Sequence, residues 1–423
     1  MRRRAAVLGP LLILVLATTA GVRSRHEWQH VERAEVGAWR GWAVVVGDAA
    51  SVGTATRLTL ALDGRRYDLW AYGGVARTVQ RRAAGDRVWF EGTRSRFGAA
   101  ASARRAAVRH VVGRCTAEFL GDVRDGPILA VAANRVRAVL RDAADTSMSP
   151  QTSALFTGLV IGDDLRQDQT TIDAFRASGL SHLTAVSGQN VAFVLLAAGP
   201  VLRRLRPVAR WLATAALIGG FVVATRAEPS VLRAAVMAVL AATAFAVGRP
   251  VHPVRLLGLA VTALVLVDPF LVWSVAFWLS VTATAGVCVV GPAVEARLPG
   301  PPWWRAPTAL TLGAQAGVAL PSLLVFGRLP LVALVSNPAA APVAGVVMLC
   351  GLPAAALARV AAVLGAPALG RLVMWPMAVG TRWVAEVATV ASALQVPRPV
   401  TVVGWAAVVV GVVSSPPRTR VPI

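Results

Sequence analysis

Long apolar runs, most of them about as long as a membrane-spanning helix, follow one another through the second half of the chain. Nine of them lie at residues 183–202, 207–225, 231–247, 254–267, 271–291, 308–326, 331–356, 372–394 and 400–415. Another apolar run, Ala5–Val22, follows three arginines at the N-terminus, and we interpret 1–22 as an uncleaved first helix. The pattern predicts a polytopic α-helical membrane protein of about ten spans.

Residues 23–114 show a different pattern, because no apolar run there reaches membrane length. Short alternating segments occur instead at 39–46, 56–62, 65–72, 87–92 and 108–112. Asp63 and Gly64 separate two of these segments and are typical of a hairpin turn, in which both residues need positive φ. About five short strands predict a small β-barrel, for which the OB-fold is the natural candidate.

Residues 115–177 connect this domain to the apolar runs, and we expect them to form amphipathic helices at the membrane surface. Apolar positions such as Ile128 and Val131 alternate there with Arg135, Arg137 and Arg141. The membrane domain then covers 178–415, and 416–423 form a short tail.

Composition and charge support this division of the chain. Hydrophobic residues make up 56% of the sequence and the net charge is +22, which excludes an ordinary soluble protein. Arginines cluster in alternate loops between the apolar runs, so we expect both termini in the cytoplasm and 23–114 outside a cytoplasmic membrane. The three cysteines and five histidines show no metal-binding spacing, so neither a metal nor another cofactor is expected.

The outer domain combines positive charge with aromatic residues. Residues 23–114 contain 17 arginines and 8 acidic residues, a net charge of +9. Aromatic rings in a basic groove hold single-stranded nucleic acid by stacking, without sequence preference. The DNA-binding candidates are Trp39, Arg40, Arg57, Arg65, Arg66, Tyr67, Trp70, Arg87 and Trp89. The alternative is that the aromatic rings fill the barrel core and the arginines are merely solvated.

A polar stretch, Ser178–Val191 (SGLSHLTAVSGQNV), lies where the outer segments meet the long apolar region. Polar groups near hydrocarbon are costly and indicate function by default, although caps and small packing residues would explain this stretch equally well. Arg233 lies just inside an apolar run, so its side chain should face the bundle interior or a cavity. Proline and glycine recur in the later runs and indicate broken helices, which favour a transporter or channel over a plain anchor.

Four blocks in order resemble the ComEC-type competence proteins, the inner-membrane DNA channels of natural transformation. The blocks are Gly162-Asp163 with GLSHLTAVSGQNV at 179–191; Pro229, Ser230, Arg233, Ala234 and Met237; Asp268-Pro269 with Phe277, Leu279, Ser280 and Thr284; and Phe326, Leu329, Pro330, Asn337 and Pro342. The resemblance implies a channel for single-stranded DNA behind an external OB-like domain. The channel or gating candidates are Asp163, His182, Ser187, Gly188, Asn190, Arg233, Asp268, Ser280 and Asn337.

Two departures from the family shape the expected partners. Many relatives carry histidine where this chain has Asn190. Many also carry a C-terminal metallo-β-lactamase-like domain, which the resemblance does not extend to here, and no HxHxDH motif occurs in the sequence. We therefore expect no enzyme activity from this chain, and a separate nuclease. The sequence has no GxxxxGK[ST] motif either, so a cytoplasmic motor is expected, together with a DNA receptor and the option of homo-oligomers.

Two other functions stay open at this point. One is a paralogous transporter of another solute, or a degenerate scaffold without DNA uptake. The other is an intramembrane hydrolase with Ser187 as nucleophile and His182 as base. The second is disfavoured because there is no GxSxG elbow and residues five apart do not share a helix face.

Overall fold

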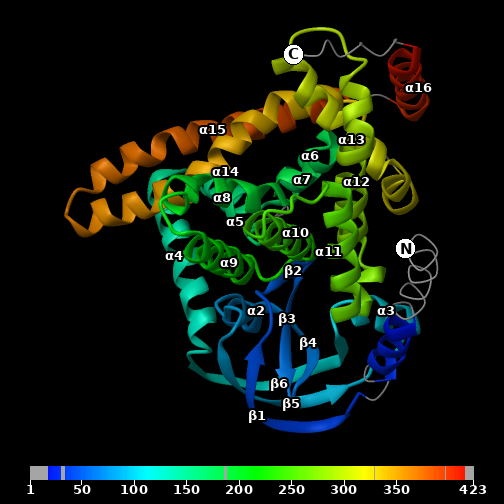
Figure 1. The fold of residues 1–423 in the computed structure, drawn as a ribbon. Coiled ribbons are helices and arrows are strands. Elements are labelled where there is room, and N and C mark those ends of the chain that lie inside the picture. The colour runs from blue at the N-terminus through cyan, green and yellow to red at the C-terminus, as the bar shows by residue number, and fades with distance from the viewer. Residues whose placement is uncertain (1–17, 30–33, 185–187, 328, 396, 415–423) are drawn as a thin grey trace. The chain divides into compact units, whose positions relative to one another are not determined.

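The computed structural model describes residues 18–29, 34–184, 188–327, 329–395 and 397–414. The chain forms two compact units: residues 1–136 with 260–274, and residues 137–259 with 275–423. Figure 1 shows strands only in the first unit and helices throughout the second.

The first unit contains a six-stranded sheet. Its strands are β1 (Gly37–Val45), β2 (Ala50–Val52), β3 (Ala55–Leu62), β4 (Arg65–Ala71), β5 (Arg87–Ser95) and β6 (Val111–Arg124), in the order β1-β5-β6-β4-β3-β2. All pairs are antiparallel except β4–β6, which is parallel. A short β1–β3 pairing, Val44 with Ala61 and Val45 with Leu60, joins two strands that are distant in this order. The sheet is not a closed barrel, but it is compatible with the predicted OB-like domain.

Alternation along the strands builds the core of this unit. Leu58, Leu60 and Leu62 on β3 are fully buried, while the residues between them are partly exposed. Asp63 and Gly64, which join β3 to β4, have φ values of 50° and 77°, so the predicted hairpin turn is confirmed. Two short helices, α2 (Gly73–Gln80) and α3 (Ala100–Ala107), complete the connections.

The last strand corrects one prediction. Residues 108–110 precede β6, and residues 115–124, which we expected to be helical, form its second half. Their side chains pair across to β5, with Glu91 opposite Phe119 and Arg87 opposite Arg124. The expected boundary at residue 114 therefore falls inside a strand, because pairing with β5 decides the conformation of a segment whose own pattern is ambiguous.

A segment far along the chain also belongs to the first unit. The short helix η1 (Pro269–Trp273) places Phe270, which is fully buried, in the core of the sheet. The Phe270 ring meets Trp28, from the helical stretch 18–29, edge-on at 5.0 Å between ring centroids.

The second unit is helical. Its helices are α4 (Ile128–Ser147), α5 (Pro150–Ile161), α6 (Gln169–Ser178), α7 (Ser181–Thr184), α8 (Gly188–Leu202), α9 (Pro207–Ala224), α10 (Pro229–Ala246), α11 (Pro253–Val267), α12 (Val275–Glu295), α13 (Pro302–Phe326), α14 (Ala333–Val363), α15 (Pro367–Ala393) and α16 (Arg398–Ser414). The first residues of α4 and the last residues of α11 belong to the first unit. Several begin with proline in the first turn, where its missing N–H costs nothing.

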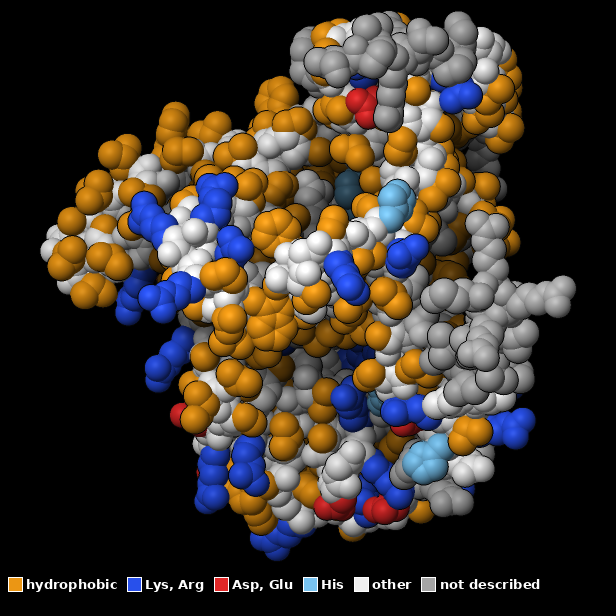
Figure 2. Space-filling model, in the orientation of Figure 1, with side chains coloured by type: hydrophobic (Ala, Val, Ile, Leu, Met, Phe, Trp, Pro, Cys, Tyr) orange, Lys and Arg blue, Asp and Glu red, His pale blue; other side chains and the backbone are white. Residues whose placement is uncertain are grey.

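Five described helices, α9, α10, α12, α13 and α14, are long and apolar enough to cross a membrane. Helices α8, α11 and α16 are apolar but shorter, and most of the predicted first span lies outside the described residues. Figure 2 shows hydrophobic side chains over the outward surface of the α14–α15 hairpin, where Val360, Leu372 and Trp375 are more than half exposed. Such a surface suits lipid, so the prediction of a polytopic α-helical membrane protein is confirmed.

Helices α12 and α13 pack through glycine. A Cβ atom on Gly317 would lie 2.0 Å from the Thr282 carbonyl oxygen, and one on Gly286 would lie 2.1 Å from that of Gly313. Small residues let membrane helices approach until their backbones touch. This contact therefore requires glycine at these positions.

Candidate functional site

The polar stretch 178–191 begins at the junction of α6 and α14. Helix α6 ends at Gly179, whose left-handed φ of 76° terminates the helix. The Ser336 hydroxyl on α14 donates to the Ser178 carbonyl at 2.8 Å, and a Cβ on Gly179 would lie 2.7 Å from that of Ala333. Gly179 is therefore required both by its φ and by its closeness to α14.

After this junction the helix is interrupted. The one-turn helix α7 carries His182, whose exposed ring lies with Nδ1 3.2 Å from the Gly179 carbonyl oxygen. Residues 185–187, including the candidate Ser187, lie outside the described residues, and α8 begins at Gly188. Within the described residues, the polar stretch thus contains a helix break between α6 and α7, at Gly179 and Leu180.

The structure brings three candidates together at Gly188 of α8. Arg233, on α10, is 5% exposed, and its Nε donates to the Ser280 hydroxyl on α12 at 2.9 Å. Its Nη1 lies 3.2 Å from the Met237 sulfur. Its Nη2 points to α8, because a Cβ on Gly188 would lie 3.0 Å from it. The sequence predicted Gly188, Arg233 and Ser280 as separate channel candidates. The contacts of Arg233 with the other two depend on the packing of three helices.

Asn190, the position at which many relatives carry histidine, is buried on α8. Its Nδ2 donates to the Leu159 carbonyl oxygen at 3.0 Å. Leu159 lies in the last turn of α5, where carbonyls have no partner within the helix. The Asn190 amide therefore joins α8 to the end of α5.

Asp163 is fully buried in a cluster with two arginines of α4. Its carboxylate accepts from Arg141 Nε at 2.6 Å and lies 3.4 Å from Arg137 Nη2. Arg137 also donates to the Ala224 carbonyl at 3.1 Å. The arginines are four residues apart and share one face of α4. Asp163 thus ties the loop after α5 to α4 through an ionic contact.

The remaining two channel candidates are Asn337 and Asp268. Asn337, on α14, is 7% exposed, and its Oδ1 has no hydrogen-bond partner within the described part of the chain. Asp268 belongs to the first unit, where it accepts from the Phe270 backbone N–H at 3.0 Å and lies 3.0 Å from His110 Nε2. Burial of Phe270 in the sheet core holds Asp268 within the first unit, and its role as a channel or gating residue stays a prediction.

The DNA-binding candidates divide by the face of the sheet. Tyr67 is fully buried, with its hydroxyl donating to the Glu35 carbonyl, so the expectation that its ring stacks on bases is wrong. Trp39 is partly buried against Phe90, at 5.9 Å between ring centroids. Burial also lowers the pKa of Arg57 and Arg66. Alternation turns Tyr67 and Trp39 inward, whereas Arg57 and Arg66 lie on the other side of their strands and are partly buried there.

Three candidates share the outward face of β1 and β5 with two residues that the candidate set lacked. Trp42 lies opposite Trp89, with the rings edge-on at 5.5 Å. Arg40 lies over Trp89 at 5.8 Å, and Arg124 lies over Trp42 at 4.1 Å. Arg87 pairs with Arg124 across to β6. Trp42 was detectable as one of the aromatic residues between arginines, but Arg124 was hidden because its segment read as helix. The two other candidates lie elsewhere: Arg65 lies 3.5 Å from Glu35, and the Trp70 ring lies 6.0 Å from Arg114.

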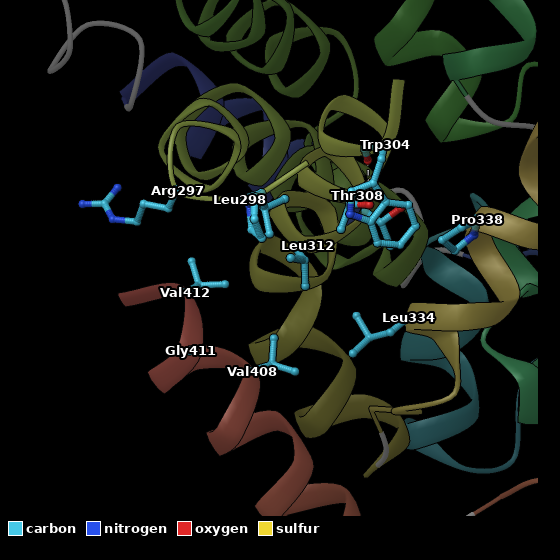
Figure 3. A pocket seen from close by; sticks show the side chains of 12 residues that line it. Arg297, Leu298, Trp304, Thr308, Leu312, Leu334, Pro338, Val408, Gly411 and Val412 are labelled. Atoms are coloured by element: carbon cyan, nitrogen blue, oxygen red, sulfur yellow. Dashed lines mark hydrogen bonds between the residues drawn. The ribbon is translucent and has the colours of Figure 1, made fainter. Parts of the chain in front are cut away.

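The larger of the two described pockets is a groove of about 440 Å³. Figure 3 shows Trp304, Thr308 and Leu312 of α13 on one side of it and Val408 and Val412 of α16 on another. Its lining is mostly apolar and contains none of the candidate residues. It is not the site described above.

Together these features define a polytopic α-helical membrane protein whose polar stretch 178–191 packs against α5, α10 and α14. The profile of the family described as Competence protein matches residues 159–415. Because this match covers more than half of the sequence, the chain belongs to the competence protein family, and the resemblance seen in the sequence is confirmed. No curated protein and no solved structure gives a significant match.

Proposed function

We propose that this protein forms the path by which single-stranded DNA crosses the cytoplasmic membrane during natural transformation. Membership of the competence family supports a role in DNA uptake. The observation that carries the channel hypothesis is the buried guanidinium of Arg233, which lies against Gly188, in the same polar stretch as the helix break at Gly179. Interrupted helices inside a membrane domain line substrate paths, and a fixed positive charge suits a polyanion.

The first unit supplies the capture step of this proposal. The outward face of β1, β5 and β6 combines two tryptophans with Arg40, Arg87 and Arg124, of which the Arg40 side chain is 72% exposed. Arginines meet phosphates and aromatic rings stack on bases, so the face fits a single strand. In this proposal the unit lies outside the cell and both chain termini are cytoplasmic.

Other proteins complete the process in this proposal. A DNA receptor delivers the strand, a separate nuclease degrades its complement, and a cytoplasmic motor supplies the driving force. This chain itself conducts and does not cleave. Homo-oligomers are compatible with this role.

The experiment that tests the proposal is uptake of labelled DNA by a deletion strain. Complementation with the wild-type gene should restore uptake, and Arg233→Ala should abolish or strongly reduce it. Arg249→Ala, which removes an exposed arginine of the same unit, is the matched control and should restore uptake fully. Normal uptake in the deletion strain would refute the proposal.

The same strain separates the proposal from the hydrolase hypothesis. Ser187→Ala should leave DNA uptake intact, because the channel needs no nucleophile. Loss of uptake in Ser187→Ala with full uptake in Arg233→Ala would favour the hydrolase.

A further inference from the structure

His110 joins three segments of the first unit that are far apart in the sequence. Its ring nitrogen Nε2 lies 3.0 Å from Asp268 Oδ2, and its Nδ1 lies 3.9 Å from Glu27 Oε2. Its ring also lies 5.1 Å from that of Phe270, measured between centroids. Glu27 belongs to the helical stretch 18–29, His110 directly precedes β6, and Asp268 begins the connection from α11 to α12.

The backbone of His110 is strained at this position. Its φ of 57° is left-handed, a conformation that residues other than glycine adopt infrequently. Its N–H donates to the Ala107 carbonyl at 2.7 Å, so the turn between α3 and β6 holds it there. Strained residues persist only where their surroundings fix them, and they gather at functional and switch regions. The ring and the backbone of one histidine are thus both fixed where the three segments meet.

The two ring nitrogens of His110 face two different carboxylates. Neutral imidazole carries a proton on only one nitrogen, so the other turns a lone pair toward a negative oxygen. The imidazolium carries a proton on both nitrogens and places a positive charge between Asp268 and Glu27. Protonation therefore strengthens both contacts. The three side chains are about 30% exposed (30%, 28% and 31% for His110, Asp268 and Glu27), so protons reach them while salt screens them less than fully exposed pairs.

Other charges near His110 come from arginines and from one more histidine. Arg66 on β4 interacts electrostatically with Asp268, and Arg109 is already paired with a carboxylate of β4. Arg23 lies on the same helical stretch as Glu27. Arginines keep their charge at every physiological pH, so they do not respond to it. His26, which precedes Glu27, is the other histidine in the described part of this unit and is tested separately.

We propose that His110 is a pH-sensitive latch, which when protonated holds the 268–274 segment and the 18–29 stretch to the sheet and when neutral holds them less firmly. Histidine is the side chain that changes charge between about pH 5 and 8. The hold is therefore firmest at the acid end of this range and weakens as the pH rises. Phe270 stays buried throughout, so the latch changes the strength of attachment and leaves the fold intact. In the topology proposed above, the pH of the medium sets the latch, but the latch itself does not depend on DNA.

The test is hydrogen exchange measured by mass spectrometry on the full chain in nanodiscs, from pH 5.5 to 8, with rates corrected for the intrinsic effect of pH. The reporter is the 268–274 segment, in which the Phe270 N–H donates to Asp268 Oδ1 at 3.0 Å. Its protection in the wild type should fall roughly three- to tenfold as the pH rises, the size expected when one or two partly exposed ion pairs weaken. Protection of β3 should stay constant, which shows that the change is local.

Four variants assign the change to its groups. His110→Asn tolerates a left-handed φ but cannot gain a charge, so its protection should not vary with pH. Glu27→Gln and Asp268→Asn each remove one carboxylate and keep an acceptor, so each should reduce the variation. His26→Gln should behave as the wild type.

His252→Gln is the matched control, because it removes an exposed histidine of the second unit and should keep the full variation. Wild-type protection that changes less than twofold between pH 5.5 and 8 would refute the latch. A wild-type pH profile in His110→Asn, or a flat profile in His26→Gln, would assign the sensing to another group and overturn the inference. None of these outcomes depends on DNA uptake, so the latch and the proposed function can fail separately.

Discussion

Asn190 offers a quantitative test of the helical unit that is independent of DNA. Its buried amide donates to the Leu159 carbonyl at the end of α5, a group that has no helical partner. Asn190→Leu keeps a side chain of similar size and removes the donor. The carbonyl is then buried without this hydrogen bond.

Two magnitudes bracket the expected cost. An unsatisfied buried carbonyl costs about 1–3 kcal/mol, whereas measured hydrogen bonds between membrane helices contribute about 0.6 kcal/mol on average and about 1.7 at most. We expect about 1–2 kcal/mol for Asn190→Leu, because desolvation acts on a fully buried end of α5. Asn190→His should cost less, since an imidazole N–H also donates. Asn190→Asp should cost more, because a carboxylate cannot donate and would face a carbonyl oxygen.

The assay is the half-life of the purified protein in detergent at a fixed temperature, followed by the monodisperse peak in size-exclusion chromatography. Many large proteins unfold irreversibly in vitro, so a rate is the appropriate measure. Asn190→Leu should shorten the half-life roughly 5- to 30-fold, if the contact is lost in the transition state for unfolding. The control is Gln395→Leu, which replaces an exposed amide and should have little effect. A half-life within twofold of wild type for Asn190→Leu, or equal losses for histidine and aspartate, would refute the reasoning.

Three further predictions concern other parts of the molecule. Tyr67→Phe should leave the affinity for single-stranded DNA unchanged and lower the free energy of unfolding by about 1 kcal/mol, because the fully buried ring loses only its hydrogen bond to the Glu35 carbonyl. A large loss of affinity in a filter-binding titration would show instead that Tyr67 contacts DNA. Burial raises the pKa of the Cys115 thiol to about 12, so at pH 8 only roughly one thiol in ten thousand is ionised. In a variant whose other cysteines are serine, maleimide labelling should therefore be negligible until denaturant is added. Rapid labelling of the native protein would contradict this prediction. Gly317→Leu should prevent accumulation of folded protein in the membrane, because even the Cβ of leucine would overlap the Thr282 carbonyl. A normal yield and half-life would show that α12 and α13 do not pack in this way.

The first unit shows which strands can be predicted from local sequence pattern and which cannot. Four of its strands were predictable within a few residues, because one inward face and turn residues such as Asp63-Gly64 are both local signals. The second half of β6 was not predictable, because residues 115–124 become a strand only through pairing with β5, which lies far back in the sequence. The burial of Tyr67 and the outward position of Trp42 likewise depend on which face of each strand turns inward.

For the helical unit, the sequence by itself determined the membrane class, the positions of the apolar helices and the family, because helix length, hydrophobicity and short ordered motifs are properties of contiguous residues. Only the tertiary structure decided what the polar residues contact. In the structure, Arg233 lies against Gly188 and Ser280, and Asn190 donates to Leu159. Asp163 lies between two arginines, and Asp268 belongs to the first unit. Each of these contacts joins residues on separate elements, and the partner of a buried polar group is chosen by how the helices pack, which no local pattern encodes.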